Sequence, residues 1–128
     1  MSNTRPLVAV VDDEKSVRIA VERLLRSANF DVETFPSGVE LLESLKTHQP
    51  DCVVLDLHMP HMDGFTVQSR LTEASIRIPI VVITGHDATE TRERALAGGA
   101  SAYLRKPMDD QILLDAITNA IAQAGSSS

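Results

Sequence analysis

Three unbroken apolar runs, each followed by polar residues, constrain the fold of this 128-residue chain more than any other feature. The runs are 7–11 before Asp12 and Asp13, 52–55 before Asp56, and 80–83 before Thr84. A strand with one wet face alternates polar and apolar residues, whereas a strand buried on both faces of a sheet is apolar throughout. The runs therefore predict neighbouring parallel strands, whose polar ends lie where the sheet meets water.

The stretches between and after these runs predict five amphipathic helices and two more strands. The expected helices are 17–28, 37–45, 65–71, 87–96 and 112–121, and the further strands are an edge strand, 31–35, and a last strand, 102–104. Two capping-box patterns mark expected helix starts, Ser37 with Glu40 and Asp87 with Glu90. Helix starts and strand ends thus alternate along the chain.

For two of the expected helices, the sequence predicts which residues face the core. The helix 87–96 offers mainly Ala88, Ala95 and Leu96 to the core before Gly98 and Gly99 end it. We therefore expect it to be the most weakly anchored helix, and the one that moves most easily. The last helix is expected to turn six apolar residues inward, namely Ile112, Leu113, Ala116, Ile117, Ala120 and Ile121.

Strands alternating with helices predict an α/β fold with a doubly wound, five-stranded parallel sheet. The strand order 2-1-3-4-5 places the end of the first strand beside the end of the third, at the point where the order reverses and ligands bind. We expect residues 1–124 to form one domain, and residues 125–128 to be a flexible tail or the start of a linker.

Composition excludes several classes of protein. The net charge of −6 argues against nucleic-acid binding by this segment itself. No apolar run approaches the roughly 20 residues that cross a bilayer, and we expect neither a signal peptide nor a membrane partner. The one cysteine, Cys52, lies in a buried run and is expected to be a core residue. A cytoplasmic location is therefore the expectation.

Asp12, Asp13 and Asp56 are expected to converge at one edge of the sheet. Carboxylates that lie so close raise one another's pKa unless a cation intervenes, and Mg²⁺ suits such oxygen ligands. Lys106 ends the last strand and is aimed by Pro107, so its ammonium can reach the same pocket. A carboxylate beside Mg²⁺ and a lysine is a good phosphoryl acceptor. The alternatives are solvated acids at strand ends and a surface lysine.

Five motifs carry a family resemblance, namely Val-Asp-Asp-Glu (11–14), Asp-Leu-His-Met-Pro-His-Met-Asp-Gly (56–64), Ile-Thr-Gly-His (83–86), Gly-Gly-Ala (98–100) and Tyr-Leu-Arg-Lys-Pro (103–107). Over nearly the whole chain, the sequence resembles the response-regulator receiver domains of bacterial two-component signalling, which have a flavodoxin-like fold. The residues of its motifs are similar to those of receivers of nitrogen-fixation-type and LuxR-type transcriptional regulators. The resemblance implies phosphotransfer to this domain and autodephosphorylation, but no other enzymatic activity.

The resemblance assigns roles at the phosphorylation site. Asp56 would accept the phosphoryl group from a phosphohistidine on a sensor histidine kinase or a histidine phosphotransfer protein. Asp13 would bind Mg²⁺ directly and Asp12 through water, with Asp56 and the backbone carbonyl of His58 as further ligands. Lys106 would pair with the phosphoryl oxygens.

The resemblance also assigns switch residues. The Lys106–Pro107 bond would be cis. Thr84 would hydrogen-bond the phosphate, and Tyr103 would then turn toward the core, although a half-buried edge-strand aromatic is the alternative for Tyr103. The face made by helix 87–96, strand 102–104 and helix 112–121 would repack. It would then favour a homodimer or control a DNA-binding output domain that lies outside this chain.

Three residues are expected to modulate the phosphate. His58 and His86 stand two positions after Asp56 and Thr84, and their resemblance-implied role is to tune phosphate lifetime. We expect a dependence on pH between about 6 and 8, the alternative being two exposed histidines without effect. Gly85 leaves space for a bulky donor. The His58–His61 spacing is weak evidence for zinc, because Pro60 prevents a helix there.

Three other functions fit the sequence less well. A phosphatase of the haloacid-dehalogenase type carries a second aspartate two positions after the nucleophile, where this chain has His58. The sequence lacks the glycine-rich motifs that are typical of nucleotide binding. A receiver that acts only as a docking surface, without phosphorylation, is opposed by the intact acids, Thr84 and Lys106, and a phosphorylation assay distinguishes it.

Overall fold

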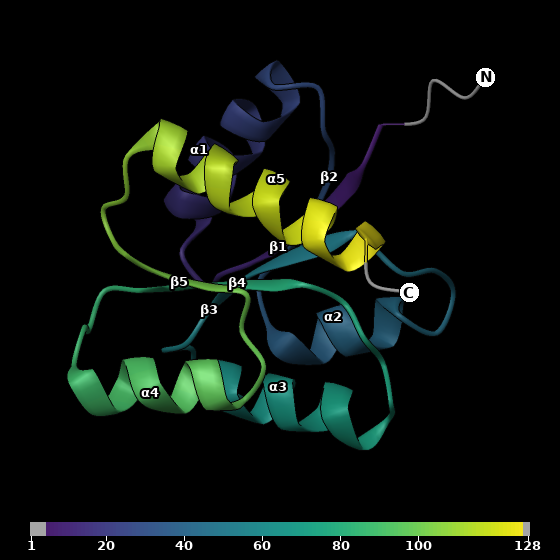
Figure 1. Ribbon diagram of the computed structural model, residues 1–128. Helices are drawn as coiled ribbons and strands as arrows, with labels where there is room; N and C mark the ends of the chain where they lie inside the picture. Colours follow the sequence, from purple (N-terminus) through teal and green to yellow (C-terminus); the bar gives the residue numbers. More distant parts are fainter. Residues whose placement is uncertain (1–4, 127–128) are drawn as a thin grey trace.

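Strands and helices alternate without exception along residues 5–126, the part of the chain that the computed structural model describes (Figure 1). In chain order the elements are β1 (Leu7–Val11), α1 (Lys15–Ser27), β2 (Asp31–Phe35), α2 (Gly38–Ser44), β3 (Cys52–Asp56), α3 (Gly64–Glu73), β4 (Ile80–Thr84), α4 (Thr89–Ala97), β5 (Ala102–Arg105) and α5 (Asp110–Ser126). Within residues 5–126, the predicted number and order of elements are confirmed.

The five strands form one parallel sheet in the order β2-β1-β3-β4-β5, which confirms the predicted topology. In the register, Val11 pairs with Leu55 and Asp56 pairs with Ile83. The carboxyl ends of β1, β3 and β4 are therefore level with one another. Polar residues that follow these strands must meet at a single edge of the sheet.

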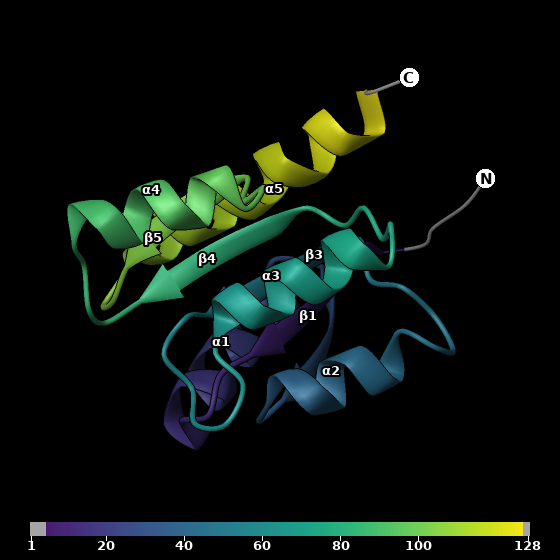
Figure 2. The same cartoon turned by 90° about the horizontal axis from the view of Figure 1, so that it is seen from below.

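Helices cover both faces of the sheet, α1 and α5 on one side and α2, α3 and α4 on the other (Figure 1). Figure 2 shows the second face, with α3 between α2 and α4. Successive strand residues feed opposite cores: Val8 and Val10 pack under α1 and α5, whereas Ala9 and Val11 pack on the other side. This is why the central strands are apolar at every position. Cys52 is fully buried, as predicted, and burial raises the pKa of its thiol to about 12.

Ser37 caps α2 as predicted, because its hydroxyl accepts a hydrogen bond from the backbone N–H of Glu40. The second capping prediction is wrong. α4 begins one residue later than expected, with Ala88 at the N-cap position and no side-chain cap. The Asp87 carboxylate instead contacts Tyr103 and Arg105. A cap at α3 was missed, where Asp63 accepts from the N–H of Thr66.

Ala95 is the one residue of α4 that is buried, which agrees with the predicted weak anchoring. Ala88 and Leu96 were predicted to be core residues but are exposed, since α4 meets the sheet along a narrow line. Ile112 is also exposed, at 54%, because it lies about 100° around α5 from the buried stripe. Leu113, Ile117 and Ala120 form that stripe.

α5 continues to Ser126, so residues 125 and 126 are helical where we expected a tail. Residues 127 and 128 of that expected tail lie outside the described residues. None of the described helices combines the length and the apolar character required to span a membrane.

Candidate functional site

Four strands deliver polar side chains to one edge of the sheet. Asp12 follows β1, Asp56 ends β3, Thr84 ends β4 and Lys106 follows β5. Backbone hydrogen bonds align these ends, from Leu57 N–H to the Ile83 carbonyl and from Lys106 N–H to the Thr84 carbonyl. The predicted site residues are thus brought together by the register of the sheet.

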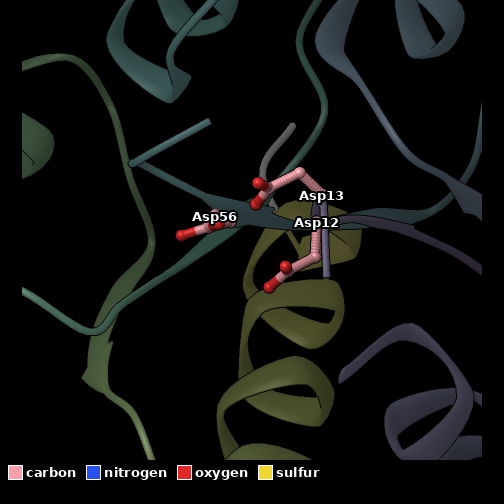
Figure 3. A group of neighbouring side chains, drawn as sticks. All are labelled: Asp12, Asp13 and Asp56. Carbon is pink, nitrogen blue, oxygen red and sulfur yellow. The ribbon is translucent and has the colours of Figure 1, made fainter. Parts of the chain in front are cut away.

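The carboxylates of Asp12, Asp13 and Asp56 lie next to one another (Figure 3). One oxygen from each can be chosen so that all three lie within 4.8 Å of one another. Asp12 is fully buried and Asp56 is 2% exposed, whereas Asp13 is exposed. Three hard oxygen donors, two of them desolvated and one open to water, fit Mg²⁺, which keeps part of its water shell.

Lys106 is the cation of the site. Its Nζ lies 2.8 Å from Asp12 Oδ2, 3.3 Å from Glu14 Oε1 and 3.6 Å from Asp56 Oδ2. Burial alone would lower the pKa of this amine, but the hydrogen bond to Asp12 and the charge of Asp56 outweigh burial and raise it. Lys106 is therefore a fixed positive charge. The Lys106–Pro107 peptide bond that follows is cis, the geometry that the resemblance implied.

The carboxyl group of Asp56 is destabilised in its ionised form. Its pKa is raised to about 6, first by burial and then by the negative charge of Asp12. Lys106 and the N–H of His58, which donates to Asp56 Oδ1 at 3.3 Å, oppose this rise only in part. A group of this kind gains from a bound cation or from a change that removes its charge.

Thr84 is fully buried, and two histidines engage its hydroxyl. Thr84 Oγ1 accepts from the backbone N–H of His86 at 3.0 Å and lies 3.0 Å from His58 Nδ1. The hydroxyl donates to Nδ1 when the ring proton of neutral His58 is on Nε2. Burial and the neighbouring His86 ring, whose centroid is 4.7 Å away, lower the pKa of His58 and favour that neutral form.

A pocket of about 270 Å³ opens over Asp56. Its lining residues are Asp13, Glu14, Asp56, His58, Gly85, His86 and Lys106. A Cβ at Gly85 would have no described atom within 4 Å. A Cβ at Gly64 would lie 2.8 Å from the Asp56 carbonyl oxygen, so glycine lets the loop after β3 close beneath the site.

Tyr103 stands apart from this pocket and contacts the loop 85–88. Its hydroxyl donates to Asp87 Oδ1 at 2.9 Å, and Asp87 Oδ2 lies 3.6 Å from Arg105. The Arg92 guanidinium lies 5.8 Å from the centre of the Tyr103 ring. Partial burial and then the bond to Asp87 raise the pKa of the Tyr103 hydroxyl.

Glu14 and Asp87 are the site residues that sequence reasoning missed. Glu14 lies in the motif 11–14 and is a third consecutive acid after a buried strand, a signal that could have indicated its contact with Lys106. The pattern Asp-x-x-Glu predicts only a helix cap at Asp87. Only the packing of β5 against the loop 85–88 shows its contact with Tyr103.

Comparison with known proteins identifies the family to which this chain is similar. The model of the response regulator receiver domain matches residues 8–118. Nodulation protein W of Bradyrhizobium diazoefficiens is 40% identical over 119 residues, 93% of this chain and 52% of that protein. Transcriptional regulatory protein TdiR of Thauera aromatica is 37% identical over 115 residues, 90% of this chain and 51% of that protein.

A solved structure of a response regulator receiver protein from Burkholderia phymatum is similar as well. It has a TM-score of 0.82 and 44% sequence identity, and the match covers 92% of this chain and 96% of that one. The chain spans about half the length of the two curated relatives above.

Proposed function

Since this chain belongs to the response regulator receiver domain family, we propose that it is a phosphorylation-dependent signalling switch with Asp56 as the phosphoacceptor. The observation that carries the proposal is the setting of Asp56: it lies beside two further carboxylates and 3.6 Å from Lys106, at the base of an open pocket. A buried carboxylate with a raised pKa has no evident structural use at that place.

The phosphoryl donor in this proposal is a phosphohistidine on a sensor histidine kinase or a histidine phosphotransfer protein. A carboxylate oxygen of Asp56 attacks phosphorus, the phosphorus–nitrogen bond breaks, and the donor histidine, whose other ring nitrogen carries a proton, leaves as neutral imidazole. Asp12, Asp13, Asp56 and the backbone carbonyl of His58 would hold Mg²⁺. The bound cation would neutralise charge on the acids and on the transferred phosphoryl group.

Lys106 and Thr84 each exchange a partner in this reaction. Lys106 now pairs with Asp12 and Glu14, and its ammonium would turn to the phosphoryl oxygens. Thr84 now contacts His58 Nδ1, and its hydroxyl would donate to the phosphate instead. Lys106 Nζ already lies 3.6 Å from Asp56 Oδ2, and Thr84 ends the strand next to the one that Asp56 ends, so charge neutralisation would need no rearrangement of the sheet.

The rim of the pocket would set how readily the phosphate is gained and lost. His58 and His86 line the pocket over Asp56, through which an attacking water would approach, and we assign them to the control of phosphate lifetime. Gly85 leaves the pocket open to a donor as large as an imidazole. These three residues are the modulating set of the proposal.

The output we propose is a change of the face made by α4, β5 and α5. Thr84 would draw the loop 85–88 toward Asp56, and Tyr103 would follow. The altered face would favour a homodimer or control a further domain. The TdiR relative is named a transcriptional regulatory protein. Transcription control through a DNA-binding domain outside this chain is therefore the process we propose.

Intact-mass spectrometry after incubation with a small phosphodonor and Mg²⁺ tests the proposal. We expect one phosphoryl adduct on the wild type, and no adduct on Asp56→Asn. Asp31→Asn is the matched control, because Asp31 is an exposed acid at the start of β2, at the far end of the sheet. An adduct of unchanged yield on Asp56→Asn would overturn the assignment of the phosphoacceptor.

A further inference from the structure

Asp87 is hydrogen-bonded to Tyr103, although the local sequence around Asp87 is typical of a helix N-cap. Its carboxylate accepts the Tyr103 hydroxyl at 2.9 Å and lies 3.6 Å from Arg105. Meanwhile α4 begins at Thr89 without a side-chain cap. Four backbone N–H groups at a helix start lack partners within the helix, and a capping aspartate stabilises the helix by accepting from one of them.

Asp87 has the pattern to supply that cap. Asp87 and Glu90 are spaced as a capping box, and they would serve if α4 began one residue earlier, at Ala88. Ala88 now has an extended backbone, with φ −153° and ψ 152°. While the Asp87 carboxylate holds the Tyr103 hydroxyl across to β5, it caps no N–H group in the first turn of α4. The two uses therefore compete.

The position of Asp87 connects this competition to the phosphorylation site. Asp87 lies three residues after Thr84, whose hydroxyl is engaged by His58 and by the backbone N–H of His86. Movement of the Thr84 hydroxyl toward Asp56 would break its bond to the His86 N–H and would shift the loop 85–88. Since α4 buries only Ala95 among its residues, its first turn can rearrange at low cost.

We propose that Asp87 is a positioning residue that acts through Tyr103. Its carboxylate holds the Tyr103 hydroxyl while Thr84 contacts His58, and it releases Tyr103 to cap α4 when Thr84 turns to the phosphorylated Asp56. The trigger rests on the proposed function, whereas the hold on Tyr103 does not. The position of Tyr103 and the length of α4 would therefore change together when Thr84 turns to the phosphorylated Asp56.

The sequence provides a specific probe, because Tyr103 is the single tyrosine and the chain has no tryptophan. Tyrosine emission, and its quenching by acrylamide, therefore report on Tyr103 alone. Three substitutions separate the two uses of Asp87. Asp87→Asn keeps both an acceptor for the hydroxyl and a capping group, Asp87→Ser keeps a cap but is too short to reach Tyr103, and Asp87→Ala keeps neither. Arg105→Gln is the control for the ion pair.

Without a phosphoryl analogue, we expect Asp87→Ser and Asp87→Ala to change the emission and quenching of Tyr103, and Asp87→Asn and Arg105→Gln to resemble the wild type. With Mg²⁺ and beryllofluoride, Asp87→Ser should bind the anion about three- to tenfold more tightly than Asp87→Ala, which lacks the cap. Asp87→Asn should bind as the wild type does.

The possible outcomes test the hold of Asp87 on Tyr103 separately from the trigger at Thr84. Equal Tyr103 emission and quenching in all the Asp87 variants would overturn the hold. A changed emission with equal beryllofluoride affinities for Asp87→Ser and Asp87→Ala would overturn the exchange of the hold for a cap. A wild type that binds no beryllofluoride in the presence of Mg²⁺ would overturn the proposed function, and the trigger with it.

Discussion

Lys106 Nζ lies 2.8 Å from Asp12 Oδ2 but 3.6 Å from Asp56 Oδ2, so the lysine is closer to a proposed metal ligand than to the proposed phosphoacceptor. Asp12 is fully buried, and Lys106 is the cation paired with it. The same ammonium thus compensates the buried acid and competes for it with any divalent cation. This double role leads to opposite effects on stability and on metal affinity.

We expect Lys106→Met to lower the free energy of unfolding in metal-free buffer by about 3 kcal/mol, because it leaves Asp12 and Asp56 without their cation. The same change should tighten Mg²⁺ binding about three- to tenfold, since a competing charge is removed. Chemical denaturation and a Mg²⁺ titration measure the two effects. Lys46→Met, which breaks an exposed pair with Glu43, is the control and should change neither.

Asp56→Asn should stabilise the metal-free protein at neutral pH. The pKa of Asp56 is about 6 in the folded protein, above its ordinary value of 3.8. The protonated form therefore contributes stability that is complete below pH 3.8 and is lost as the pH rises through 6. At pH 7 the ionised group costs on the order of 3 kcal/mol, at about 1.36 kcal/mol per pKa unit.

The measurement is the free energy of unfolding of wild type and Asp56→Asn from pH 4 to pH 8 with a chelator present. The advantage of the variant should grow across this range and should shrink when Mg²⁺ is added to the wild type. A difference that does not vary with pH would show that Asp56 titrates normally in the folded protein.

Much of the fold follows from local patterns of residues. The runs that end at Asp56 and Thr84 predict parallel strands, because only strands buried on both faces are apolar at each position. Leu113 and Ile117 mark the buried stripe of α5 in the same way. Ile112 shows where such patterns fail: an apolar residue is compatible with a helix flank, and only packing decides which flank faces the sheet.

The features of the site also divide into those that local sequence patterns predict and those that only packing decides. Convergence of Asp12, Asp56 and Lys106 follows from strand ends and topology, which the sequence carries. The partners of individual polar groups do not, because they depend on rotamers and loop paths. Thr84 bonding to His58, and Asp87 to Tyr103, involve residues 26 and 16 positions apart, and no local spacing encodes either pair.

Gly85→Leu should slow phosphorylation and leave the fold intact. A Cβ at Gly85 meets no described atom within 4 Å, but a leucine side chain would extend into the pocket over Asp56. We expect the rate with a small phosphodonor to fall about tenfold, and the rate with a phosphohistidine protein to fall further. Gly85→Ala is the control and should react at nearly the wild-type rate. Unchanged kinetics in Gly85→Leu would argue that donors enter by another path.

Gly98→Ala should loosen α4 through Gln68. The buried Gln68 amide donates from Nε2 to the Ala95 carbonyl at 2.9 Å and ties α3 to α4. A Cβ at Gly98 would lie 3.0 Å from that Nε2, so the amide must shift and weaken its bond. The φ of Gly98 is −77°, so backbone strain plays no part.

We expect Gly98→Ala to cost about 1 kcal/mol of stability, the typical net value of one hydrogen bond. Amide protection should fall in α4 more than in α3, because α4 has little other anchorage. Hydrogen exchange of the native protein gives this comparison, and Gln68→Leu should reproduce it by removing the donor. Gly85→Ala adds the same methyl group in open space and should leave exchange in α4 unchanged. Protection of α4 that stays at the wild-type level in both Gly98→Ala and Gln68→Leu would mean that Ala95 alone anchors the helix.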